Sequence, residues 1–163
     1  SFGVIGKGFT TSASALGSST YSAETTTAPF DSFTGSITEG GSSVAVITGL
    51  ELSVDNGMEA LYVVGSDETL EPSIGKSTVT GSITAYFEDT TLIDKFIAET
   101  ASAIVFTLTD ALGNDYIVSL PNIKYNSGSP EVSGPGAITV TLDFVALYYA
   151  SDASQMKITR VPA

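Results

Sequence analysis

The feature that most constrains this chain is a strict alternation of side-chain character over a long stretch near its end. In residues 137–150, the even positions from Ile138 to Tyr148 are apolar, whereas the odd positions begin with Thr139 and Thr141. Successive side chains of a β-strand point to opposite faces, so a period of two predicts a strand with one buried face. The odd positions turn apolar towards Tyr149, which predicts that a helix or another subunit covers that end.

Other segments show the same alternation and predict further strands at residues 44–54, 77–87, 104–109 and 116–120. Asp55-Asn56-Gly57 supplies the turn chemistry that ends the first of these. Gly113-Asn114 lies in a hairpin turn that joins the last two, and Pro121 predicts the end or an edge of the return strand.

The remaining segments are shorter or less regular. Residues 60–65 and 157–160 are expected to form short strands, and residues 66–76 and 126–136 are expected to form loops. A short helix is expected at about residues 91–99, with Asp89 or Thr90 as its cap. Its apolar side chains recur at helical spacing, so one face of the helix must pack on the sheet.

These elements predict a mainly β fold, an antiparallel β-sandwich or partial barrel with one short flanking α-helix. Residues 1–29 are expected to form an N-terminal strand followed by a flexible arm, because residues 10–28 are small, polar and aperiodic. Residues 30–163 are expected to form the β-sandwich domain.

The composition removes most catalytic chemistry. The chain has no Cys, His or Trp, so thiolate ligands and the usual general base near neutral pH are missing. The acidic pairs Asp67-Glu68 and Glu88-Asp89 are interpreted as solvated turns, and no calcium-loop pattern occurs. We therefore expect no enzymatic activity, no metal and no cofactor, and no apolar run is long enough for a membrane anchor.

The predicted strands and the net charge of −12 point towards a structural role. Long strands leave exposed edges, which a ring of identical subunits removes by closing them into a shared barrel. A chain this acidic repels nucleic acid phosphates and gains no free energy from released counterions.

The order of these elements resembles that of the tail tube proteins of long-tailed bacteriophages. The similarity spans about Phe30 to Arg160, with the helix between two sets of hairpin-forming strands. The segments that carry it are residues 30–52, 62–66, 75–87, 92–96, 106–110, 113, 117–123, 138–146 and 157–160.

This resemblance implies a subunit of a tube in the phage tail of the virion, assembled with itself and with other tail proteins. It implies hexameric rings that stack, with an acidic lumen through which DNA passes without specific binding. Some members of that family have additional sequence upstream, and a chain with two such domains would complete a ring with three subunits.

Two groups of residues are candidates for these roles. Polar strand positions that are candidates for the lumen are Glu51, Ser53, Thr80, Ser82, Thr84, Thr139, Thr141 and Asp143. Candidates for contacts between rings are Thr20, Tyr21, Asp67, Glu68, Glu71, Lys76, Ser129 and Glu131. The alternative functions are an extracellular β-sandwich binding module, such as an adhesin or a carbohydrate-binding domain, and another component of a tail or secretion tube.

Overall fold

The computed structural model describes residues 3–4, 6, 11, 13, 24, 26, 30, 35–43, 46–66, 68–69, 71, 73, 75–131 and 136–163. The chain divides into two compact units, one of residues 1–26 and 55–77 and one of residues 27–54 and 78–163. The predicted arm at residues 10–28 lies almost entirely outside the described residues and stays a prediction. Among the described residues, no helix is long and apolar enough to cross a membrane.

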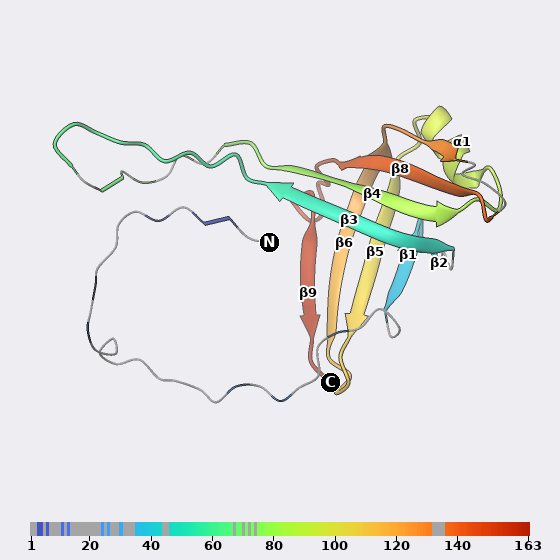
Figure 1. Ribbon diagram of the computed structural model, residues 1–163, viewed down its shortest axis with the longest axis horizontal. Coiled ribbons are helices and arrows are strands. Elements are labelled where there is room, and N and C mark those ends of the chain that lie inside the picture. The colour runs from blue at the N-terminus through green and yellow to red at the C-terminus, as the bar shows by residue number, and fades with distance from the viewer. Residues whose placement is uncertain are drawn as a thin grey trace. The chain divides into compact units, whose positions relative to one another are not determined.

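The described elements are nine strands and one short helix (Figure 1). In chain order they are β1 (Ser36–Glu39), β2 (Ser42–Ser43), β3 (Ile47–Asp55), β4 (Thr78–Tyr86), α1 (Thr91–Ile97), β5 (Ser102–Thr109), β6 (Asp115–Tyr125), β7 (Ser129–Glu131), β8 (Thr139–Ala146) and β9 (Lys157–Val161). The expected mainly β fold with one short helix is confirmed.

The strands form one antiparallel sheet that is not closed, with the order β2-β1-β5-β6-β8-β4-β3. Strand β6 joins two layers, because its first half pairs with β9 and its last residues, Ile123 to Tyr125, pair with β8. In Figure 1, β3, β4 and β8 run across β1, β5, β6 and β9. This bend produces the predicted sandwich-like arrangement from a single sheet.

The core is built from four strands, and in β4 and β8 its residues alternate as the period of two predicts. In β8 the even positions from Val140 to Ala146 are buried, whereas Thr141 and Asp143 are exposed. The full cluster of buried side chains is Val79, Ile83, Ala85, Ile104, Leu120, Ile123, Tyr125, Val140, Leu142, Phe144 and Ala146. Leu50 and Leu52 of β3 pack against this cluster and are partly buried.

Gly81 stands at the centre of β4 because the space beside its Cα is already filled. A Cβ atom at this position would lie 2.3 Å from the Glu51 carbonyl oxygen and 2.5 Å from Cζ of Phe144. A glycine inside a strand often marks such a close approach of other atoms. The absence of a side chain at Gly81 therefore lets the Phe144 ring fill the core beneath β4.

Two expected turns are confirmed. Asp55 Oδ1 accepts a hydrogen bond from the Gly57 N–H at 2.8 Å, and Gly57 has a φ of 56°. In the β5–β6 hairpin, Asp110 Oδ1 accepts from the N–H groups of Leu112 and Asn114 at 2.8 and 2.9 Å. Asn114 Nδ2 also donates to Asp110 Oδ2 at 2.8 Å. This side-chain hydrogen bond is the main cause that holds the pKa of Asp110 below its ordinary value, and the bond from the Asn114 backbone N–H is the next.

Pro121 does not end the return strand, so that part of the prediction was wrong. Strand β6 continues through Pro121 to Tyr125. The pairing of β6 with β9 stops at Ser119, and its pairing with β8 starts at Ile123. On the other side of β6, the pairing with β5 is irregular between Leu120 and Ile123. A proline has no N–H to donate, and here it occupies the point where the hydrogen-bond ladders are interrupted.

Several other element predictions need correction. Residues 60–65 form no strand, because no neighbouring strand pairs with them, and only an isolated bridge joins Glu59 to Ser73. The expected loop at 126–136 contains β7, and the last long strand is limited to Thr139–Ala146. Strands β1 and β2 were not expected, because they are too short to show an alternation.

Candidate functional site

The lumen candidates that come from three separate strands lie on one surface. Cross-strand pairing places Ser82 opposite Asp143 and Thr84 opposite Thr141, and the two threonine Oγ1 atoms are 3.3 Å apart. Residues that directly oppose each other in an antiparallel pair share a face. We call this surface, on the side of β3, β4 and β8 away from the core, the polar face; it comprises Glu51, Ser53, Thr80, Ser82, Thr84, Thr139, Thr141 and Asp143.

The polar face is acidic, since it carries Glu51 and Asp143, and strands β3, β4 and β8 contain no Lys or Arg. A shallow cavity of about 410 Å³ opens between these two residues and is lined by Thr80 and Ser82. Asp143 is held in place by Ser127, whose Oγ donates to Asp143 Oδ2 at 2.7 Å. The cavity is open to solvent, and it lacks the enclosure of a small-molecule site.

Two residues beside the polar face were not among the candidates. Tyr86 is half exposed and opposes Thr139 on β8. Lys124 opposes Val145, which in turn opposes Thr80, so a lysine borders the acidic surface on β6. The alternation that placed Tyr86 on the polar side of its strand was visible in the sequence, whereas the row that contains Lys124 depends on pairing between distant strands.

The candidates for ring contacts lie in separate parts of the chain. Glu68, Glu71 and Lys76 are exposed in the unit that contains residues 55–77. Ser129 and Glu131 lie on β7, where Ser129 opposes Thr141 of the polar face. The other three candidates, Thr20, Tyr21 and Asp67, lie outside the described residues.

The chain between β3 and β4 exposes apolar side chains that sequence reasoning assigned to a strand. We call residues 56–77 the β3–β4 segment. Tyr62 is 75% exposed, Val64 is fully exposed, and Leu61 and Val63 are more than two-fifths exposed. Consecutive exposed apolar residues of this kind are candidates for a contact surface. This segment therefore adds an apolar component to the acidic contact candidates that it carries.

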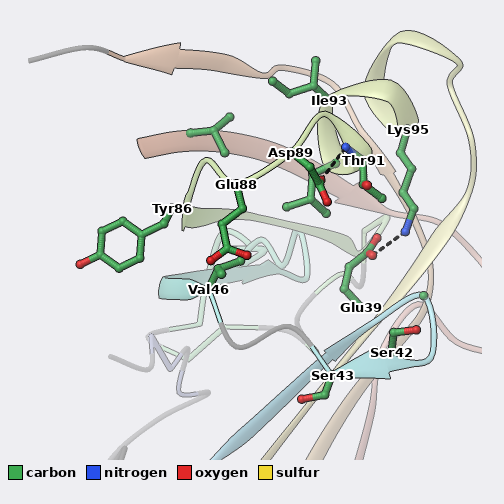
Figure 2. A pocket seen from close by; sticks show the side chains of 13 residues that line it. Glu39, Ser42, Ser43, Val46, Tyr86, Glu88, Asp89, Thr91, Ile93 and Lys95 are labelled. Atoms are coloured by element: carbon green, nitrogen blue, oxygen red, sulfur yellow. Dashed lines mark hydrogen bonds and ion pairs between the residues drawn. The ribbon is translucent and has the colours of Figure 1, made fainter. Parts of the chain in front are cut away.

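A buried carboxylate lies where helix α1 meets strand β1. Glu39 of β1 is 4% exposed, and Figure 2 shows its carboxylate facing the amino group of Lys95 on α1. Lys95 Nζ donates to Oε2 at 2.5 Å, Ser102 Oγ donates to Oε1 at 2.6 Å, and the Tyr125 hydroxyl donates to Oε1 at 3.2 Å. These three donors satisfy a charge that would otherwise be costly to bury.

The same cluster shifts the titration of Tyr125. Burial raises the pKa of the Tyr125 hydroxyl far above its ordinary value, and the negative charge of Glu39 and the hydrogen bond to it act in the same direction. A tyrosine held neutral in this way serves as a permanent donor to Glu39. The arrangement anchors helix α1 to β1, β5 and β6 and activates no nucleophile.

The cavity beside this cluster, of about 490 Å³, is lined by Glu39, Glu88, Asp89 and Lys95 among others (Figure 2). Asp89 Oδ1 accepts from the Thr91 N–H at 2.9 Å, which caps the helix start and holds the pKa of Asp89 below its ordinary value. Within the part of the chain that the structure describes, no group of three acidic side chains is arranged to hold a metal ion.

An open antiparallel sheet with a polar outer face, exposed edges and an exposed apolar segment defines a structural subunit that is completed by assembly. The chain belongs to the phage tail tube protein family, whose model matches residues 1–146. It is therefore a structural component of the tube in the tail of the virion, and the family resemblance seen in the sequence is confirmed.

Solved structures share the fold at low identity. The sheath/tube terminator of the PVC extracellular contractile injection system matches with a TM-score of 0.61 and 11% identity, covering 83% of this chain and 99% of that chain. The SPP1 tail tube matches with a TM-score of 0.54 and 10% identity, covering 83% and 80%. The tail of an empty GTA particle matches with a TM-score of 0.51 and 17% identity, covering 72% and 84%. No curated protein sequence matches the chain.

Proposed function

We propose that the polar face lines the lumen of the tail tube and that DNA passes along it during infection. The observation that carries this proposal is the alignment of Glu51, Thr84, Thr141 and Asp143 on one continuous surface without a basic residue on its three strands. Duplex DNA carries about one negative charge per 1.7 Å of its axis. A wall of carboxylates and hydroxyls, with Lys124 only at its border, offers the phosphates little positive charge, so DNA slides without being held.

The subunits form hexameric rings that stack into the tube, or trimeric rings if each chain of a longer form carried two such domains. The physical support is that β2 and β3 are the end strands of the described sheet order, so both present unpaired edges. Head-to-tail contacts between identical subunits close into rings when the rotation allows it. The arm within residues 1–29 and the loops around Glu68 and Ser129 then contact adjacent rings, and residues 30–163 form the tube domain.

A single cysteine tests which face lines the lumen, because the chain has no Cys of its own. Thr141→Cys tubes are labelled with a small biotin maleimide and then exposed to streptavidin. We expect labelling in the tube, but streptavidin binding only at the tube ends, whereas labelled subunits before assembly bind streptavidin fully. Streptavidin decoration along the length of the tubes would place the polar face outside and reject the proposal.

A further inference from the structure

Strand β9 leaves one of its edges open. Lys157 to Val161 are all exposed, and β6 is the single partner of β9 among the described strands. The backbone N–H and C=O groups on the other edge are therefore available to a further extended segment. Such an edge is one of the surfaces to which chains bind by adding a strand.

An apolar row of the sheet leads to this edge. Ile37, Phe106, Val118 and Ile158 directly oppose each other in turn across β1, β5, β6 and β9. Val118 is 8% exposed, whereas Ile158 is 59% exposed. Ile37 and Phe106 are partly buried, so the row is covered by the protein as far as Val118 and ends in solvent at Ile158, where a partner can cover it.

β9 is also a basic element in an acidic protein. It carries Lys157 and Arg160, and residues 157–163 contain no acidic residue, whereas the whole chain has a net charge of −12. Lys157 is 3.5 Å from Asp152, with 57% of its side chain exposed, and Arg160 forms no ion pair with the described residues. The two cations are available to a partner.

The β3–β4 segment has the complementary properties. It carries Glu59, Asp67, Glu68 and Glu71 against one lysine, Lys76. Its exposed apolar side chains include Leu61, Tyr62 and Val64. One surface of this chain is therefore basic and apolar with an open edge. Another is acidic and apolar, and among its described residues the bridge between Glu59 and Ser73 is the single β-pairing.

We propose that the β3–β4 segment of one copy docks on the β9 edge of a second copy in the adjacent ring. This inference rests on the proposed stacking of rings. Leu61 and Val64 cover Ile158, and Glu68 and Glu71 face Arg160 and Lys157, which lie on the two opposite faces of β9, Arg160 on the side of Ile158. Opposite charges steer the two copies together and set the register of the contact. The buried apolar side chains stabilise the contact once it has formed.

Two charge-reversed variants test the contact. The first is Lys157→Glu/Arg160→Glu, and the second is Glu68→Lys/Glu71→Lys. Each variant alone brings like charges together at every copy-to-copy contact, which raises the critical concentration for tube formation by at least about tenfold. An equimolar mixture restores opposite charges at every contact between unlike copies, so the mixture forms tubes in which the two variants alternate.

Tube formation is followed by sedimentation and negative-stain microscopy, and circular dichroism checks the fold of each variant. Tubes from the mixture, with none from either variant alone, support the contact and also show that both variants are folded. If either variant alone forms tubes as readily as the wild type, or if the folded variants fail to form tubes when mixed, the contact is wrong while the tube function stands. If the wild type forms neither rings nor tubes, the proposed function itself fails.

Discussion

Lys95 Nζ donates to Glu39 Oε2 across 2.5 Å, which joins the only helix among the described residues to strand β1. Helix α1 has no fully buried residue, so its attachment depends on this ion pair and on partly buried side chains such as Phe96. The contact also explains Gly40, which follows Glu39 with a φ of 59°. A Cβ atom at Gly40 would lie 3.0 Å from Lys95 Nζ.

Replacing Lys95 with Met should lower the free energy of unfolding by about 2 kcal/mol, because a buried carboxylate loses its charged partner. Urea denaturation of the wild type and of Lys95→Met measures the change. The same substitution in a Glu39→Gln background is the control, and there we expect less than half of the effect. An equal loss in both backgrounds would show that Lys95 acts through its aliphatic packing alone.

Stability should fall at alkaline pH because of Tyr125. Its pKa in the folded protein is raised above the value of about 10 in the unfolded chain, so the folded state keeps its proton when the unfolded state loses it. The contribution is fully present below pH 10 and is lost above it, by about 1.4 kcal/mol per pH unit. Denaturation from pH 8 to 11 of wild type and Tyr125→Phe measures this, and the difference between the two curves should be flat below pH 10 and then decline. A difference that stays constant across the range would refute the assignment.

Gly81→Ala should destabilise the fold by about 1–3 kcal/mol, because the new methyl group meets the Glu51 carbonyl oxygen and the Phe144 ring. Gly49→Ala is the matched control in the adjacent strand, since its Cβ would meet only Cβ of Thr84 at 3.8 Å. We expect the control to change stability by less than about 0.5 kcal/mol. Thermal unfolding compares the two, and equal losses would mean that strand propensity rather than the close approach explains Gly81.

Reversing the charge of the polar face should make the tube hold DNA. Tubes of Glu51→Lys/Asp143→Lys are expected to retain short duplex DNA at low salt, protect it from nuclease, and release it as salt rises. The matched control is the neutral pair Glu51→Gln/Asp143→Asn, which removes the acidic charge without adding a cation and should retain much less. Co-sedimentation at two salt concentrations measures retention. Bound DNA that the nuclease digests fully would indicate a surface outside the lumen.

Much of the fold could be predicted because its strands and turns follow from patterns among neighbouring residues. The alternation around Val140 to Ala146 identified the buried side of β8, and the residues around Asp110 and Gly113 identified the β5–β6 turn. The short helix was also predicted correctly, since apolar spacing is a local signal, and so was the closing strand β9. The predictions failed where pairing with a distant strand determines the structure. Residues 60–65 have strand composition but no neighbouring strand. Strand β6 passes through Pro121 because its pairing partners change there.

The sequence by itself determined that the chain is mainly β, which side of β4 and of β8 is apolar, and that its strands carry acids and hydroxyls on the opposite side. Only the tertiary structure decided that Ser82 meets Asp143 and Thr84 meets Thr141, so that separate polar strands become one surface. It also decided that Glu39 is buried among Lys95, Ser102 and Tyr125, residues far apart in the chain. The reason is that alternation depends on neighbouring residues in one strand, whereas the register between strands depends on long-range pairing and on the packing of the core.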